Sequence, residues 1–188
     1  MSFSVCVFCG SSPGGDPRFR AAAEQTGQEI GRRGWTLVYG GAHVGLMGIV
    51  ADATLRAGGR VVGVIPRFLY EREVGHDGIT ALEIVGSLTE RKLRMGELSD
   101  AFLSLPGGIG TLDELFEAWS WSQVGLQQKP NGLLNVTGYY DGLVAFADHA
   151  ASSGFVKPQH RAMLTVSADV IELLDGFEAR VRSGTAAG

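Results

Sequence analysis

The sequence has no long hydrophobic run, no cluster of positive charge and only two cysteines in 188 residues. No apolar stretch approaches the roughly 20 residues that a membrane-spanning helix needs, and the N-terminus lacks the charged and then apolar pattern of a signal peptide. The 16 basic and 20 acidic side chains give a net charge of −4, without the Lys/Arg stripe that supports nonspecific binding of nucleic acid. We therefore expect a cytoplasmic protein that has neither a membrane nor a nucleic acid as a partner.

The two cysteines, Cys6 and Cys9, form a C-x-x-C pattern, which also occurs in redox proteins. They fall within an apolar run, residues 4–9, that is typical of a strand. Residues three apart on a strand point to opposite faces, whereas a redox pair lies at the start of a helix. We therefore expect two buried core thiols. The four histidines show no spacing typical of metal ligands, so no metal site is predicted.

Glycine is the residue type in excess, because 28 glycines are about twice the usual share of ~7%. Only six prolines accompany them, and no collagen-like repeat is present. Hydrophobic residues at 45% and charged residues at 19% are close to the globular average, which disfavours a disordered chain or a coiled coil. The length predicts one domain, residues 1–183, followed by a flexible tail, residues 184–188.

Short apolar, β-branched runs alternate with longer segments of helical period, which is typical of a parallel sheet with crossover helices. The expected strands cover residues 4–9, 36–39, 61–65, 79–85, 101–105 and 133–136. The expected helices begin after Asp16, Gly45 and Ser87, and cover residues 112–124, 139–153 and 167–182. The predicted fold class is therefore α/β, with a Rossmann-like, doubly wound, mostly parallel sheet and helices on both faces. Such sheets bind ligands at the carboxyl ends of their strands.

Three glycine-rich loops follow three of these strands, at residues 10–15, 40–45 and 106–111. They would open on one rim of the sheet, where helix N-termini present free N–H groups to an anion. The third loop is the sharpest case, because its glycines allow a close approach and Thr111 adds a hydroxyl. The sequence contains no Walker A motif and no dinucleotide fingerprint. Glycine-rich turns alone leave phosphate binding and tight packing equally open.

Glu114 follows Thr111 by three residues, and this spacing has two interpretations. In a capping box the carboxylate would only bond the Thr111 N–H. In a functional site it would turn toward a phosphorylated sugar, with Glu117 one turn further on, and paired carboxylates suit glycosidic cleavage. Arg91 and Lys92, on the preceding helix, either belong to a solvated face or bind substrate.

Several motifs together resemble those of the LOG ("lonely guy") family of cytokinin riboside 5'-monophosphate phosphoribohydrolases. The resemblance covers residues 5–156. The stretches that carry it are PGGIGTLDE at 106–114, ERKLRM at 90–95, GGAHVGLMG at 40–48, CGSS at 9–12 and KPNGLLNVTGYYDGL at 129–143.

This resemblance implies hydrolysis of the N-glycosidic bond of adenosine-type 5'-monophosphates to free base and ribose 5-phosphate, without metal or organic cofactor. Arg91 and Glu114 would be the catalytic pair. It also implies a homodimer with the site near the subunit interface. The implied substrate-binding residues are Ser11, Gly41, Glu73, Lys92, Gly107, Gly108, Ile109, Gly110, Thr111 and Ser120.

The sequence departs from the family pattern at three places, and two other functions stay open. Ala42 replaces the third glycine of a G-G-G loop, Leu88-Thr89 stands where Met-His is common, and Asp113 stands where Glu is frequent. A nucleotide-binding module of the same fold would hold the ligand without cleaving it. A lysine decarboxylase would need pyridoxal phosphate on a lysine, and the chain has three lysines, Lys92, Lys129 and Lys157.

Overall fold

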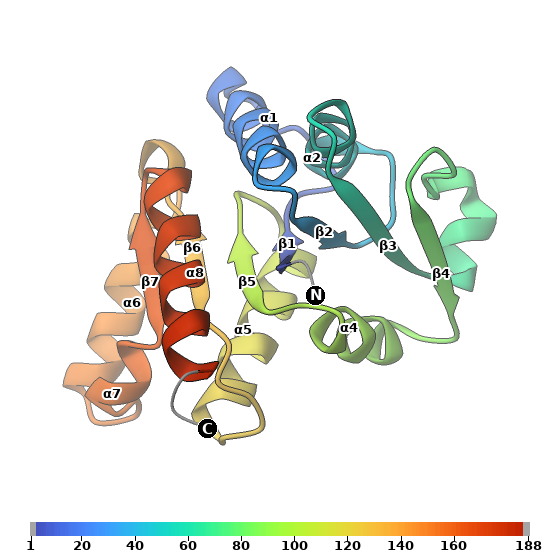
Figure 1. Cartoon of the computed structure of the whole chain (residues 1–188). Coiled ribbons are helices and arrows are strands. Elements are labelled where there is room, and N and C mark those ends of the chain that lie inside the picture. Colours follow the sequence, from blue (N-terminus) through green and yellow to red (C-terminus); the bar gives the residue numbers. More distant parts are fainter. Residues whose placement is uncertain (1–2, 186–188) are drawn as a thin grey trace.

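A computed structural model describes residues 3–185 and places seven strands in one sheet (Figure 1). For Glu73, Gly184 and Thr185 it describes the backbone alone. The strand order is β4-β3-β2-β1-β5-β6-β7, and every neighbouring pair is parallel. The strands are β1 (Ser4–Phe8), β2 (Thr36–Tyr39), β3 (Arg60–Pro66), β4 (Ala81–Val85), β5 (Ala101–Ser104), β6 (Asn131–Leu134) and β7 (Leu164–Ser167). The predicted α/β fold class is confirmed.

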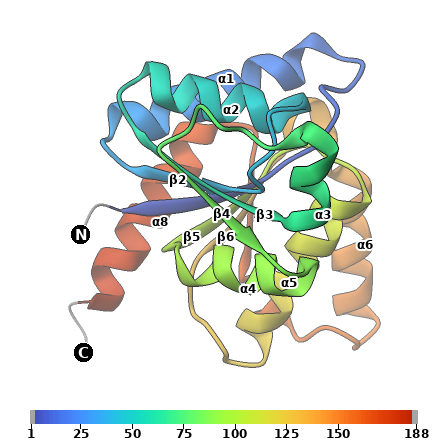
Figure 2. The ribbon, with the colours of Figure 1, turned by 90° about the vertical axis from the view of Figure 1, so that its right-hand side faces the viewer.

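Helices cover both faces of the sheet (Figure 2). On one face lie α1 (Pro17–Arg32), α2 (Gly45–Arg56) and α8 (Val170–Thr185), whose apolar side chains pack on the sheet in one core cluster. The other face carries α4 (Leu88–Glu97), α5 (Ile109–Gln123) and α6 (Asp141–Ser152), packed in two further clusters. The short elements are α3 (Arg67–Leu69), η1 (Tyr70–Val74), η2 (Val136–Gly138) and α7 (Pro158–Arg161).

The central strand β1 shows why the two cysteines cannot pair. Cys6 packs in the core cluster under α4 and α5, whereas Cys9 packs in the cluster under α1 and α2. Both are free and buried, as predicted. Burial raises the pKa of both thiols, so they stay protonated and unreactive at neutral pH.

The chain reverses its direction of winding between β1 and β5. Strands β2, β3 and β4 extend the sheet on one side of β1, and β5, β6 and β7 extend it on the other. The loop after β1 leads to α1 on one face of the sheet, and the loop after β5 leads to α5 on the other face. Gly10 N–H donates to the Pro106 carbonyl at 3.1 Å and joins these two loops. This is the switch point at which doubly wound sheets bind ligands.

The N-caps predicted at Asp16 and Ser87 are confirmed, since each side chain accepts a hydrogen bond from the first turn of its helix. Other boundaries differ from those predicted. β6 ends at Leu134 rather than residue 136 because the Asn135 side chain accepts from Tyr140 N–H and turns the chain. α8 starts at Val170 rather than 167, because Asp169 caps it through Ile171 N–H.

Some elements were not predicted at all. β7 and α7 lie in a stretch for which the sequence analysis gave no strand or helix, and α3 with η1 occupy a segment expected to be an irregular polar stretch. α8 continues to Thr185, two residues into the expected tail, and residues 186–188 lie outside the described part. No helix within residues 3–185 is long and apolar enough to cross a membrane.

Candidate active site

A cavity of about 360 Å³ opens at the carboxyl ends of β1, β2 and β5, between the start of α5 and the segment that contains α3 and η1. The residues predicted from sequence that line it are Ser11, Arg91, Gly108, Ile109, Gly110, Thr111 and Glu114. The cavity therefore gathers side chains and backbone from all three glycine-rich loops and from α4. A second hollow of about 240 Å³ shares the lining residues Ser11 and Gly108 with this cavity and is also lined by Gly107.

The N-terminus of α5 forms one end of the cavity. The helix begins at Ile109, with Gly108 as a cap that has no side chain to bond the first turn. The free N–H groups of this turn are therefore available to an anion in the cavity. A Cβ atom at Gly107 would overlap the Thr111 hydroxyl, so glycine at 107 lets that hydroxyl sit against the loop.

Glu114 lies in the second turn of α5 and points into the cavity. The capping-box interpretation is wrong, because the helix starts two residues before Thr111 and no side chain caps it. Glu114 is only 9% exposed. Its carboxyl is instead paired with Arg91, whose Nη1 lies 3.5 Å from Oε1.

Arg91 is held by main-chain acceptors of the sheet. Its Nε donates to the Val64 carbonyl and its Nη2 donates to the Gly40 carbonyl, both at 3.1 Å. Because a guanidinium is a planar, rigid fork, these two bonds fix the direction in which Nη1 meets Glu114. The pair is thus anchored at the carboxyl ends of β3 and β2.

Burial raises the pKa of Glu114 to about 7, and the nearby Arg91 guanidinium opposes this only in part. Asp113 and Glu117 raise the pKa further, whereas Lys92 lowers it. A carboxyl group with a pKa near neutrality exchanges protons readily at that pH, as a general acid or base must.

The structure does not bring every predicted site residue to the cavity wall. Lys92 is held between Asp113 and Glu117, outside the lining residues. Ser120 is exposed on α5. Gly41 does not line the cavity either; it has a positive φ of 75°, and its carbonyl accepts a hydrogen bond from His76 N–H. The backbone of Glu73 lies in η1, but its side chain is outside the described ones.

An apolar wall was missed by the sequence analysis. It contains Val44 and Met47 from the second glycine loop and α2, and Leu69 and Val74 from the segment around η1. The GGAHVGLMG motif signals the first two, but nothing local signals the last two.

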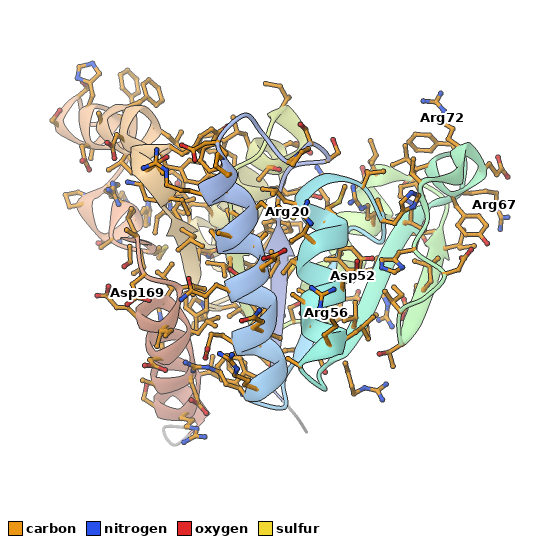
Figure 3. The ribbon with its side chains drawn as sticks, turned by 90° about the horizontal axis from the view of Figure 1, so that it is seen from above. Arg20, Asp52, Arg56, Arg67, Arg72 and Asp169 are labelled. Atoms are coloured by element: carbon orange, nitrogen blue, oxygen red, sulfur yellow. The ribbon has the colours of Figure 1, made fainter. Side chains whose placement is uncertain are left out.

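The segment that bears Leu69 and Val74 is tied down at its far end. Ala42 and Gly75 form an antiparallel bridge, and His76 Nε2 lies 3.0 Å from Oδ1 of Asp52 on α2. In Figure 3 Arg67 and Arg72 lie at the outer edge of this segment, directed away from the rest of the molecule. Leu69 and Val74 therefore face the cavity, whereas Arg67 and Arg72 are exposed.

Among the described residues, no group of three or more His, Cys, Asp or Glu side chains could hold a metal ion. Nor do the lysines fit pyridoxal phosphate. All three are described and none lines the cavity: Lys92 pairs with two carboxylates, Lys129 donates to the Gly96 carbonyl, and Lys157 is exposed before α7. An imine-forming lysine would have to reach the bound aldehyde, so this site does not suit that cofactor.

Comparison with known proteins shows the family of the chain and supports its fold. The sequence model of the family described as "Possible lysine decarboxylase" matches residues 47–177. The chain is 48% identical over 177 residues to the probable cytokinin riboside 5'-monophosphate phosphoribohydrolase LOGL5 of Oryza sativa subsp. japonica. The aligned residues cover 94% of this chain and 72% of that protein. It is 46% identical over 181 residues to the cytokinin riboside 5'-monophosphate phosphoribohydrolase of Rhodococcoides fascians, covering 96% and 89%.

Solved structures share the fold at lower identity. A molybdenum cofactor binding protein from Rippkaea orientalis superposes with a TM-score of 0.73 at 22% identity, over 96% of this chain and 98% of that one. The molybdenum cofactor carrier protein of Chlamydomonas reinhardtii gives 0.69 at 18% identity, over 97% and 99%. Fold and cavity define the chain as a Rossmann-like α/β protein with a candidate nucleotide site at its switch point. Within that class it belongs to the family of cytokinin riboside 5'-monophosphate phosphoribohydrolases.

Proposed function

We propose that the protein hydrolyses the N-glycosidic bond of adenosine-type nucleoside 5'-monophosphates, AMP and cytokinin riboside 5'-monophosphates among them. The observation that carries the proposal is the buried Arg91–Glu114 pair, which opens into the same cavity as the uncapped N-terminus of α5. The names of the most similar relatives support the same reaction.

The cavity offers a separate surface to each part of such a substrate. The 5'-phosphate would accept hydrogen bonds from N–H groups in the first turn of α5 and from the Thr111 hydroxyl, with the positive end of the helix dipole behind them. Glu114 is one helical turn further on, at the position of the ribose. The base would lie against the apolar wall that includes Met47 and Val74.

In the proposed reaction the bond between C1' and the base nitrogen breaks, and its electron pair leaves with the base. The ribose ring becomes positively charged, which an ionised Glu114 stabilises. Glu114 also accepts a proton from the water whose oxygen bonds to C1'. The departing base takes up a proton from solvent, and Glu114 then releases its own proton to solvent and returns to the ionised form. The products are free base and ribose 5-phosphate, and Arg91 favours the ionised form of Glu114 and orients its carboxylate.

The cellular and oligomeric parts of the proposal are a cytoplasmic location and a homodimer. Two buried free cysteines suit a reducing compartment. The outer side of α4 and α5 carries a hollow of about 310 Å³, lined by the apolar residues Leu93, Gly96, Phe102, Trp121 and Leu126 and by Glu97, Gln127 and Lys129. Leu93 is 51% exposed and Leu126 is 75% exposed, and a second copy would cover this surface.

The direct test is the incubation of purified protein with AMP and, in parallel, N6-isopentenyl-AMP, with chromatographic measurement of base and ribose 5-phosphate. We expect equimolar products, and a loss of roughly 10²-fold or more in turnover for Glu114→Gln and for Arg91→Ala, the scale of a preorganised electrostatic contact. A noncatalytic nucleotide-binding module would bind AMP but release no base. Equal turnover by wild type and Glu114→Gln would contradict the assignment of Glu114.

A further inference from the structure

Lys92 follows Arg91 directly in α4, yet its side chain meets α5 at a different place. Its Nζ lies 2.9 Å from Oδ2 of Asp113 and 2.5 Å from Oε2 of Glu117. These two carboxylates are four residues apart on α5, and Glu114 lies between them in the sequence. The Lys92 side chain is 16% exposed, and its ammonium group bridges two successive turns of the helix that bears Glu114.

We propose that Lys92 is a positioning residue for the Arg91–Glu114 pair, holding α5 against α4 and neutralising the two acids that flank Glu114. Its effect on the rate rests on the proposed function. Its effect on Glu114 itself does not, because it concerns the ionisation and position of a carboxyl group in the free protein.

The geometry supports this role because the contact between Arg91 and Glu114 depends on the position of α5 relative to α4. Arg91 is fixed to the sheet by the carbonyls of Val64 and Gly40, so the guanidinium cannot follow α5 if that helix shifts. Its separation from Glu114 is already 3.5 Å, near the limit for an ion pair. Lys92 is the neighbour of Arg91 on α4, so its bridge to α5 fixes the position of Glu114 relative to Arg91.

The charges support it independently. Asp113, Glu114 and Glu117 place three carboxyl groups within five residues of α5, and two cations of α4, Arg91 and Lys92, face them. Two thiols also lie close enough to interact with Glu114, Cys6 in β1 and Cys9 directly after it, and both stay uncharged because burial raises the pKa of each. Without Lys92, one guanidinium would face three acids.

Lys92→Met is therefore expected to raise the pKa of Glu114 by about 0.5 to 1, since it removes an attractive charge and frees two repulsive ones. The readout is the ¹³C chemical shift of the Glu114 carboxyl during an NMR pH titration of the free protein. Lys92→Arg should keep the wild-type midpoint. The matched control is Arg94→Met on the same helix, which removes ion pairs to Glu83 and Glu97 but none to α5, and should leave the midpoint unchanged.

In kinetics, Lys92→Met should lower kcat roughly 10-fold near neutral pH and change KM less than about 3-fold, with the loss greater at acid pH than at alkaline pH. An unchanged titration midpoint of Glu114 in Lys92→Met would overturn the proposal. So would a rise in KM at constant kcat, which marks a residue that binds substrate. If wild type releases no base from AMP, the proposed function fails, and the titration still decides the role of Lys92.

Discussion

Gly40 and Arg91 fit each other at the back of the cavity: the Gly40 carbonyl accepts a hydrogen bond from Nη2 of Arg91, and a Cβ atom at Gly40 would overlap that same nitrogen. The guanidinium thus occupies the space that a side chain at position 40 would take. Glycine at the end of β2 is therefore a condition for the Arg91–Glu114 pair.

Gly40→Ala is expected to displace the guanidinium of Arg91 and lower kcat by roughly 10²-fold, because the contact to Glu114 is lost. The midpoint of thermal unfolding should fall only slightly, since the overlapping atom is the end of a flexible side chain. Gly142→Ala in α6, where a Cβ meets nothing within 4 Å, is the control and should leave kcat unchanged. Equal kcat for Gly40→Ala and wild type would contradict the assigned position of Arg91.

The pH dependence of kcat/KM tests the state in which Glu114 acts. With a pKa of about 7, the carboxyl is protonated below this pH and ionised above it. Only the ionised form can accept a proton or stabilise positive charge on the ribose, so kcat/KM should rise with pH and level off above about 7. A profile that instead falls through this range would show that the protonated carboxyl is the active form.

Glu114 should also make stability depend on pH. Burial raises its pKa from 4.5 in an ordinary environment to about 7, so the folded protein binds the proton more tightly than the unfolded chain. This contribution is complete below about pH 4.5 and is lost as the pH rises through 7. Glu114→Gln carries no charge, so above pH 7 its free energy of unfolding should exceed that of wild type by roughly 2 to 3 kcal/mol. At about pH 5 the two proteins should have similar free energies of unfolding. Urea denaturation at both pH values provides the measurement, and a difference that does not change with pH would contradict the raised pKa.

Local signals explain why most of the fold could be predicted from the sequence. The apolar runs at β1, β2, β3 and β5, and the caps Asp16 and Ser87, each depend on neighbouring residues. The strand β7 could not be predicted, because its four residues are too short for a period and only their pairing with β6 makes them a strand.

In the site, too, local motifs could be predicted from the sequence, whereas features that depend on tertiary packing could not. The glycine loops and Glu114 were signalled by motif and by the carboxyl ends of strands, and they line the cavity. The direction of Lys92 could not be predicted, since adjacent residues of a helix point about 100° apart and tertiary packing decides which faces the cavity. Leu69 and Val74 were missed because the fold, and not any motif, carries their segment to the cavity.

Thr111→Val tests the proposed phosphate site. The substitution keeps the shape of this buried residue and removes its hydroxyl, so KM for AMP should rise about 10-fold, the value of one hydrogen bond to a charged group. Any residual turnover of adenosine, which lacks the phosphate, should not change. Thr54→Val, at a buried threonine of α2 outside the cavity lining, is the matched control. An unchanged KM for AMP in Thr111→Val would place the phosphate elsewhere.

Leu93→Glu tests the proposed dimer surface on α4 and α5. A carboxylate in the centre of an apolar contact is costly to bury, so the variant should sediment as a monomer at concentrations where wild type is a dimer. Ile171→Glu replaces an exposed residue of α8 that is 39% exposed and not part of this hollow, and should sediment as wild type does. Identical sedimentation of the two variants would exclude this surface as the interface.

A crystal structure of the Glu114→Gln variant with uncleaved AMP tests the central claim most directly. We expect the phosphate at the N–H groups of residues 109–111 and the side chain at position 114 within about 3.5 Å of C1', a distance at which reacting groups are placed. A complex in which that side chain turns back onto its own helix, with the ribose outside the cavity, would contradict the account.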